Sequence, residues 1–371
     1  MAHFLIVTDR RTGGVPVTTI DLARGLVELG DEVTLLADPL DGRDLLPAAV
    51  AAGVRHVPWP GQTTAAGLLV LLRLIAQQRW DAVLSSHRGC DVAVHAACIL
   101  LHRRQVIALH ADPAYEAEGT RFARLRTGMW RHTMAQARSL VVISAFVAER
   151  AAHFFPRLPP VHVVANANAR HPPAMTPVAL PAAGIRPCLV ACGRVYDAKQ
   201  PELLRPLIEE LDRLGVACDG LWIGGDNEDG LRLAKLRRDV EDHGLATRVR
   251  FIGHCADPWD ELRGSHVLVH FCTFEGFGLA IVEALAAGLP VAAFAAGALP
   301  ELIRDGVEGV LAPWVEGDPQ ASIRGLAARL AALISDRPRY AATAAAALAR
   351  AEDFTRVTMA KGYRRALLED A

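Results

Sequence analysis

The stretch Phe274–Val291, FEGFGLAIVEALAAGLPV, gives the strongest indication of the fold of this chain. It predicts a glycine-bearing loop, a helix that begins at about Gly278, and an apolar strand over 291–293. Another apolar strand is expected over 267–270, shortly before the loop. Strand, helix and strand in this order form a βαβ unit, so the sequence predicts a parallel sheet with helices on its faces.

Short apolar runs alternate with stretches of helical period on both sides of this unit. A first helix is expected over 17–29, and the proline density of 171–187 excludes a regular helix or a central strand there. The predicted strands form two series, one before and one after the proline-rich segment: 3–8, 32–37, 82–86, 105–109 and 140–143, then 188–191, 220–223, 249–252, 267–270 and 291–293.

The two series predict an α/β chain with two Rossmann-like, doubly wound domains. The expected boundaries are 1–170 for the first domain, 171–187 for the linker and 188–352 for the second domain. A C-terminal helix over 353–371 is expected to cross back to the first domain. Open α/β sheets bind ligands at the carboxyl ends of their strands, so we expect the two domains to face each other across a cleft that holds the chemistry.

The composition of this 371-residue chain excludes several classes of protein. A hydrophobic fraction of 51% excludes disorder, and a net charge of -1 predicts no nucleic-acid partner. No apolar run approaches the length of a membrane span and the first residues lack a basic leader, so a cytoplasmic location is expected. The seven scattered cysteines are expected to be reduced thiols, and the sequence predicts neither a cofactor nor a metal site.

Two glutamates flank the predicted start of the helix at Gly278. Glu275 lies in the loop before the helix, and Glu283 lies in its second turn. The unpaired amides and the positive dipole end of a helix form a site for a diphosphate. The carboxylates can accept hydrogen bonds from hydroxyls on either side of the phosphates, which suits a sugar joined to a nucleotide. The structural alternative is a glutamate pair on a solvated helix face.

A second candidate segment, Gly193–Gln200, follows the predicted strand over 188–191. Arg194 supplies a planar guanidinium and Lys199 a mobile point charge, a pairing that suits the two phosphates of a nucleoside diphosphate leaving group. In the alternative interpretation, Lys199 is an exposed side chain in the first turn of a helix and has no ligand, although a cation is disfavoured at that end.

Three further loops at strand ends carry candidate residues, each with a structural alternative. Gly13 and Gly14 follow the first strand, but the GxGxxG fingerprint of a dinucleotide site is absent, and a tight turn is the alternative. His110 follows a predicted strand and is either a ligand contact or an ordinary loop residue. Gly253 and His254 end another strand, where they form either a ligand contact or a turn.

The chain resembles the retaining glycosyltransferases of family 4, which have the two-domain GT-B fold. The resemblance rests on the E-x7-E pattern of Glu275 and Glu283 within EGFGLAIVEALAAGLPV. One departure concerns the pocket for the donor sugar, because Phe271-Cys272 stands where relatives usually have Pro-Ser. The resemblance implies the GT-B fold with its two facing domains.

The resemblance also implies a role for each candidate residue. Glu283 would bind the ribose of the nucleotide and Glu275 the transferred sugar, which His110 would reach as well. Arg194 and Lys199 match the cationic pair that the family places against the diphosphate. The remaining donor contacts that it implies are the backbone amides of Gly276, Phe277, Gly278 and Leu279, the loops at Gly13, Gly14 and Gly193, and the base-facing Gly253 and His254.

A basic stretch over 120–138 predicts an amphipathic helix without acidic residues. Phe122, Leu125, Met129 and Thr133 recur at helical spacing and form the expected apolar stripe. Either this stripe packs on the domain while the arginines are solvated, or the helix lies on an anionic membrane. The second interpretation predicts a peripheral location at the inner face of the membrane and suits a lipid-linked acceptor.

The primary hypothesis is a metal-independent transferase that moves a sugar from a nucleoside diphosphate to an acceptor hydroxyl, with retention implied by the family. The expected partners are the nucleotide-sugar donor and a saccharide, lipid-linked or small-molecule acceptor, in bacterial surface polysaccharide or natural product synthesis. The alternatives are a nucleotide-sugar hydrolase or epimerase, which consumes no acceptor, and a catalytically silent binding protein on the same fold. An NAD oxidoreductase would need the glycine fingerprint that this chain lacks.

Overall fold

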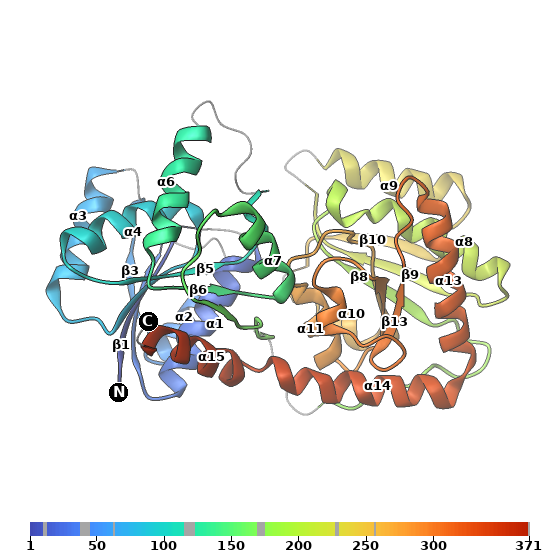
Figure 1. The fold of residues 1–371 in the computed structure, drawn as a ribbon. Helices are drawn as coiled ribbons and strands as arrows, with labels where there is room; N and C mark the ends of the chain where they lie inside the picture. The colour runs from blue at the N-terminus through green and yellow to red at the C-terminus, as the bar shows by residue number, and fades with distance from the viewer. Residues whose placement is uncertain are drawn as a thin grey trace. The chain divides into compact units, whose positions relative to one another are not determined.

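The computed structural model describes residues 1–9, 13–37, 45–61, 64–114, 123–168, 175–226, 230–255 and 257–369. The chain divides into two compact units (Figure 1). Residues 1–169 and 354–371 form the first unit, and residues 170–353 form the second. Each unit is built on a parallel sheet of its own.

The described part of the first unit contains a seven-stranded parallel sheet of order β3-β2-β1-β4-β5-β6-β7. The strand order reverses between β1 and β4, the point at which doubly wound sheets open a crevice at their carboxyl edge. The strands are β1 (His3–Thr8), β2 (Glu32–Ala37), β3 (Arg55–Pro58), β4 (Ala82–Ser85), β5 (Gln105–Leu109), β6 (Ser139–Val142) and β7 (Val161–Val163).

Helices cover both faces of this sheet, and successive side chains of β1 pack against helices on opposite faces. Phe4 and Ile6 pack into a core with α1 and α15, whereas Leu5 and Val7 pack into a core with α3 and α4. Successive residues of a strand point to opposite faces, so a strand covered on both sides is apolar throughout. The helices are α1 (Gly14–Glu28), α2 (Leu45–Ala51), α3 (Ala65–Gln77), α4 (Arg88–Leu100), α6 (Ala123–Gln136), α7 (Ala145–Phe154) and α15 (Arg356–Leu368).

The described part of the second unit contains a six-stranded parallel sheet of order β10-β9-β8-β11-β12-β13, with the reversal between β8 and β11. Its strands are β8 (Cys188–Cys192), β9 (Asp219–Ile223), β10 (Val249–Gly253), β11 (Val267–His270), β12 (Val291–Phe294) and β13 (Gly309–Ala312). Its helices are α8 (Leu204–Arg213), α9 (Leu231–Asp242), α10 (Trp259–Arg263), α11 (Leu279–Ala286), α12 (Leu299–Leu302), α13 (Pro319–Ser335) and α14 (Arg337–Ala351). The α/β prediction and the two doubly wound sheets are confirmed.

Three strands were not predicted, and all of them lie at sheet edges: β3, β7 and β13. β3 and β7 are partly exposed and contain a histidine each, so neither forms a continuous apolar run. β13 is buried but begins with Gly309, whose missing side chain lets it approach the carbonyl of Val291 in β12. A Cβ at Gly309 would lie 1.9 Å from that oxygen.

The last helix, α15, packs against α1 in the first unit (Figure 1). Arg356 donates a hydrogen bond of 2.5 Å to the buried Asp21 and one of 2.7 Å to Glu28. Gly25 permits the close approach, because a Cβ there would lie 2.8 Å from the Cβ of Ala360. The C-terminal segment is therefore held by charge and by close packing.

The predicted helix in the basic stretch is confirmed, but only Thr133 of the described residues in its apolar stripe is buried. α6 buries Trp130 and Met134, whereas Leu125 and Met129 remain 65% and 47% exposed. Residues 120–122 of the stretch lie outside the described residues. The indole of Trp130 donates a 2.9 Å hydrogen bond to the buried Asp91 of α4, and this contact selects the face that packs.

The proline-rich segment contains no helix or strand over 175–187, as predicted, while 171–174 lie outside the described residues. Within the described residues, none of the helices combines the length and the apolar character needed to cross a membrane.

Candidate functional site

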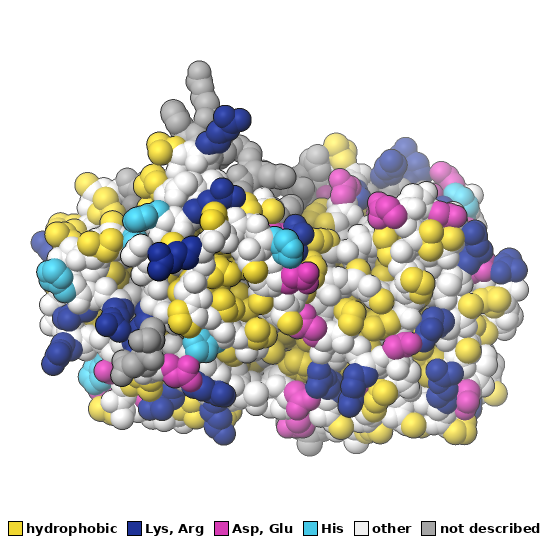
Figure 2. Space-filling view, viewed as in Figure 1, with side chains coloured by type: hydrophobic (Ala, Val, Ile, Leu, Met, Phe, Trp, Pro, Cys, Tyr) yellow, Lys and Arg dark blue, Asp and Glu magenta, His cyan; other side chains and the backbone are white. Residues whose placement is uncertain are grey.

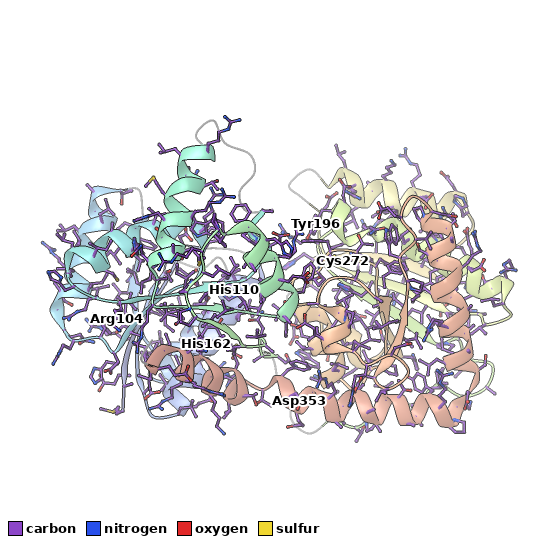
Figure 3. All side chains as sticks on the ribbon, in the orientation of Figure 1. Arg104, His110, His162, Tyr196, Cys272 and Asp353 are labelled. Atoms are coloured by element: carbon purple, nitrogen blue, oxygen red, sulfur yellow. The ribbon has the colours of Figure 1, made fainter. Side chains whose placement is uncertain are left out.

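The loops that follow β8, β9, β10 and β11 meet at the carboxyl edge of the second sheet. Figure 3 labels two of their residues, Tyr196 after β8 and Cys272 after β11. The β8 loop carries Arg194 and Lys199, and the β11 loop carries Glu275. These loops flank the reversal point of the strand order, where a ligand is expected in a doubly wound sheet.

An ion pair between Lys199 and Glu275 forms the centre of this edge. Lys199 Nζ donates to Glu275 Oε2, and the two side chains are only 19% and 16% exposed. His270, the last residue of β11, places Nε2 3.2 Å from the same carboxylate oxygen. A cation and a neutral donor therefore converge on one carboxylate.

Burial and pairing have opposite effects on the charges of this pair. Burial alone would lower the pKa of Lys199, but the adjacent Glu275 carboxylate outweighs it and raises that pKa above its ordinary value. Burial would likewise raise the pKa of Glu275, but Lys199 and the hydrogen bond from His270 hold it well below its usual range. Burial lowers the pKa of His270. The site therefore contains an ammonium, a carboxylate and a neutral imidazole at neutral pH.

His270, Cys272 and Glu275 are also the group of side chains that could hold a metal ion among the described residues, with ligand atoms within 4.8 Å of one another. Lys199 already occupies the carboxylate of this group. Burial raises the pKa of the Cys272 thiol, and its Sγ donates to the carbonyl of Phe274 at 3.2 Å. A metal would have to displace a cation and deprotonate a buried thiol, so the donor set fits a resident metal poorly.

Glycines bring the backbones of these loops into direct contact. A Cβ at Gly224, whose φ is +147°, would lie 1.8 Å from the carbonyl oxygen of Gly193. A Cβ at Gly297 would lie 2.4 Å from the carbonyl oxygen of Glu275, which also accepts a 2.9 Å hydrogen bond from Ala298. The positions of the β8 loop and of Glu275 therefore depend on residues without side chains.

The predicted helix start is confirmed: α11 begins at Leu279, and Gly278 is its N-cap with a φ of +103°. Phe277 is buried beside it, which anchors the loop to the core. The positive end of the helix dipole therefore lies a few residues after Glu275. Glu283 lies within α11 and is half-buried. The pKa of Cys192, at the end of β8, is raised mainly by the burial of its thiol and then by the negative charge of Glu283.

The other candidates of the second unit have different surroundings. Arg194 is exposed, and its guanidinium stacks on the ring of Tyr196 with 5.3 Å to the ring centroid. Within the described part of the chain, no carboxylate pairs with Arg194. Gly253 ends β10, and the exposed His254 follows it against Gly225. Arg194 therefore retains a charge that an anionic ligand can use.

The candidates of the first unit lie at the carboxyl edge of its own sheet. Gly13 is the N-cap of α1 with a φ of +92°, and Gly14 is the exposed first residue of that helix. His110 directly follows β5 (Figure 3). Asp112 is buried and accepts hydrogen bonds from Arg150 Nε at 2.6 Å and from the amide of Ala114 at 2.7 Å.

Three groups at these edges were not predicted from the sequence. His270 was assigned only to a strand, although a histidine at the end of an apolar strand five residues before Glu275 was a usable signal. Tyr196 lay within the quoted loop but received no role. Asp9 and His87, which form a 2.6 Å contact at the ends of β1 and β4, are far apart in sequence and gave no signal.

Two family models match the chain. The model described as "Glycosyltransferase Family 4" matches residues 12–167, and the model described as "Glycosyl transferases group 1" matches residues 186–336. Together they cover more than half of the chain, and the second match includes the whole edge that carries Lys199 and Glu275.

Two curated proteins that are similar in sequence are also glycosyltransferases. A D-inositol 3-phosphate glycosyltransferase of Thermobispora bispora is 29% identical, covering 96% of this chain and 90% of that protein. The lipopolysaccharide core biosynthesis mannosyltransferase LpsB of Rhizobium meliloti is 37% identical over 32% of each chain.

Two solved structures have a similar fold over the whole chain. The structure of Anabaena HepE in complex with UDP and glucose has a TM-score of 0.78 at 18% identity and covers 99% of both chains. Sucrose-phosphate synthase of Thermosynechococcus elongatus has a TM-score of 0.75 at 16% identity, also over 99% of both chains. The chain belongs to the group 1, family 4 glycosyltransferases and has their GT-B fold of two Rossmann-like domains.

Proposed function

We propose that this glycosyltransferase takes its sugar from a nucleoside diphosphate donor and transfers it to an acceptor hydroxyl with retention of the anomeric configuration. The observation that carries the proposal is the Lys199–Glu275 pair with His270 beside it. A charged ammonium and an ionised carboxylate meet the two needs of a nucleotide sugar, because the diphosphate needs a cation and the sugar hydroxyls need acceptors.

The cations of the β8 loop act on the leaving group. As the bond between the anomeric carbon and the phosphate oxygen breaks, negative charge develops on the diphosphate, and Lys199 and Arg194 stabilise it. Lys199 remains protonated at neutral pH because Glu275 raises its pKa. The positive end of α11 adds a further favourable field. These groups take the role that a divalent metal has in other transferases, so the proposed reaction needs none.

The two glutamates and His110 have positioning roles in this proposal. Glu275 accepts hydrogen bonds from hydroxyls of the transferred sugar, Glu283 accepts from the ribose, and His110 reaches the sugar from the first domain. The acceptor oxygen then bonds to the anomeric carbon on the face from which the diphosphate departs, and the acceptor proton passes to a phosphate oxygen of the leaving group. This front-face route requires no protein nucleophile and preserves the configuration.

The acceptor is proposed to be a small polyhydroxylated molecule or a saccharide, free or lipid-linked. The names of the relatives support this class, since they act on an inositol phosphate or build a lipopolysaccharide core. Assembly of a bacterial surface polysaccharide or of a glycosylated natural product is the corresponding biological role.

The test is turnover of the purified chain with UDP-, GDP- and ADP-hexoses against a panel of polyol and saccharide acceptors, with EDTA in parallel. We expect one donor to be consumed only when an acceptor is present, EDTA to have no effect, and proton NMR of the product to show the anomeric configuration of the donor. Lys199→Met should lower kcat/KM by about 10³-fold, since it removes a charge that acts in the transition state. Lys235→Met, an exposed lysine on α9, is the matched control.

Three results would contradict the proposal. Inversion at the anomeric carbon would refute the front-face route. Donor hydrolysis at the same rate with and without acceptor would indicate a hydrolase. Loss of turnover with EDTA, restored by a divalent metal, would refute the role given to Lys199 and Arg194.

A further inference from the structure

The aromatic ring of Tyr196 lies against the guanidinium of Arg194, and the proposed function gives this ring no role. Arg194 Cζ lies 5.3 Å from the ring centroid. Tyr196 is half-buried, whereas Arg194 is exposed. Both residues belong to the loop after β8, at the carboxyl edge of the second sheet, where Figure 3 labels Tyr196. The ring is therefore the fixed partner of the stack, and the guanidinium is the one that reaches solvent.

The backbone of this loop places both side chains on the same side. Val195, between them, is 1% exposed, and its amide donates a 2.9 Å hydrogen bond to the carbonyl of Gly225. Tyr196 has extended backbone angles, with φ −152° and ψ 166°. Alternate residues of an extended segment point the same way. Because Val195 packs into the core, Arg194 and Tyr196 both point away from it and meet.

Other charged groups do not compete with the ring for Arg194. Acidic and basic side chains are interspersed over the second unit in Figure 2. Among the residues that the structure describes, however, neither a hydrogen bond nor an ion pair engages the side chain of Arg194. The carboxylate of Asp197, three positions along the chain, accepts from Arg232 instead. The N–H groups of Arg194 therefore remain available to a ligand.

A stacked guanidinium is well suited to a phosphate. The ring covers one face of the guanidinium, while the N–H donors lie in its plane and can donate to two phosphate oxygens. An exposed arginine is mobile, and fixing it on binding costs conformational entropy. A ring that already holds the guanidinium removes part of this cost before the ligand arrives. The stack therefore lowers the mobility of Arg194 and leaves its hydrogen-bonding capacity intact.

The same ring lies near the buried ion pair of the site. Burial raises the pKa of the Tyr196 phenol, and the charge of Lys199 opposes that rise, as does the charge of Arg194. The ring is thus within electrostatic reach of both cations that the proposed function assigns to the diphosphate.

We propose that Tyr196 is a positioning residue for the donor, whose ring holds the Arg194 guanidinium ready to bind the diphosphate of the sugar nucleotide. This inference rests on the proposed function, which places the diphosphate at Arg194. The effect comes from the face of the ring and not from the hydroxyl group. Tyr196 acts through Arg194 and itself needs no contact with the substrate.

The first test requires no nucleotide, because the stack exists in the free chain. Nitrogen-15 relaxation of the Nε–Hε group measures the mobility of the Arg194 side chain in the full-length protein. We expect an ordered signal in the unmodified chain and in Tyr196→Phe, and a mobile one in Tyr196→Leu. Arg238, an exposed arginine of α9, is the mobile reference and should be unchanged in all three proteins.

The second test is calorimetric titration with UDP, GDP and ADP. Tyr196→Leu should weaken the Kd of the nucleotide that binds by about two- to fivefold, the contribution of an exposed cation–π contact. Tyr196→Phe should bind as the unmodified chain does, because it keeps the ring. In a chain that already carries Arg194→Ala, Tyr196→Leu should cause no further loss, since the ring acts only through Arg194.

The control removes a similar stack from the first unit. Arg131 Cζ lies 4.7 Å from the ring centroid of the half-buried Phe154. Phe154→Leu should leave the Kd of the nucleotide unchanged. Circular dichroism and melting temperature establish that each variant is folded.

The outcomes separate this inference from the proposed function. Binding that Lys199→Met weakens but Tyr196→Leu leaves unchanged would uphold the function and overturn the role of Tyr196. Equal losses in Tyr196→Phe and Tyr196→Leu would assign the effect to the hydroxyl group and refute the stack. Additive losses of Tyr196→Leu and Arg194→Ala would show that the ring acts without the arginine. An Arg194 signal as mobile as that of Arg238 in the unmodified chain would contradict the inference whichever nucleotide binds.

Discussion

The carboxyl edges of the two sheets hold their charged groups in different ways. In the second unit, Lys199 and Glu275 are both largely buried and depend on each other. In the first unit, the carboxylate of Asp112 is 3% exposed but its partner Arg150 is 41% exposed and can turn to water. The second edge therefore holds its charges in one buried pair, whereas water can reach the cation of the pair at the first edge.

Backbone packing gives the largest expected contrast between the two edges. Gly224→Ala should lower the free energy of unfolding by about 3 kcal/mol, because its Cβ would collide with the carbonyl of Gly193. Gly13→Ala in the first unit should cost only about 1 kcal/mol, since no described residue lies within 4 Å of a Cβ placed there and only the positive φ is strained. Urea unfolding measures both. Equal losses would mean that the β8 loop relaxes and is not held by Gly224.

Removal of one carboxylate from each edge is the next test. Glu275→Gln leaves Lys199 buried without a counter-charge and should cost about 2 to 3 kcal/mol of unfolding free energy. Asp112→Asn weakens one ionic contact of Arg150, whose side chain water already reaches, and should cost about 1 kcal/mol. Thermal and denaturant unfolding of both variants tests this order. A larger loss for Asp112→Asn would reverse the comparison.

The double variant Lys199→Met/Glu275→Gln tests whether the cost of Glu275→Gln comes from the unpaired charge of Lys199. If the cost of Glu275→Gln comes from an uncompensated charge, then neutralising Lys199 as well should recover about 1 to 2 kcal/mol relative to the single variant. Turnover should not recover with stability, because the double variant lacks both of the proposed contacts to the donor. Additive losses in the double-mutant cycle would show that the pair contributes no mutual stabilisation.

The smallest expected effect is the contribution of His270 to the pH dependence of the unfolding free energy. Burial lowers the pKa of His270, so below about pH 6.5 the unfolded chain binds a proton that the folded chain does not. The unfolded state then holds more protons, and stability falls as the pH falls, by at most about 1.4 kcal/mol per pH unit for this group. His270→Gln should reduce the slope of unfolding free energy between pH 7 and 5. The exposed His254→Gln is the control, and an unchanged slope in His270→Gln would contradict the assignment.

Much of the fold could be predicted because central strands of a parallel sheet are apolar on both faces. β1, β5 and β11 appear as short apolar runs with the predicted bounds. The edge strands β3 and β7 were missed because one partner and partial exposure permit polar residues. In α6, the helical period predicted the helix but not its buried face, since that face depends on a hydrogen bond to Asp91 in another helix.

The candidate site was predicted residue by residue but not as an arrangement. Lys199 and Glu275 were each singled out, one for the diphosphate and one for the sugar. Their direct contact, and the approach of His270 to the same oxygen, depend on the neighbouring positions of β8 and β11 in the sheet. Local sequence carries no information about such pairing, because Lys199 and Glu275 are 76 positions apart in the chain.

In the proposed function, the second unit holds the diphosphate of a sugar nucleotide through Lys199 and its neighbours. Isothermal titration calorimetry of the full chain with UDP, GDP and ADP, repeated with Lys199→Met and Lys235→Met, tests it most directly. We predict that one nucleoside diphosphate binds, that Lys199→Met weakens its Kd by about 10-fold or more, and that Lys235→Met leaves it unchanged. No binding of any of the three by a folded chain, or binding that Lys199→Met leaves intact, would contradict the claim.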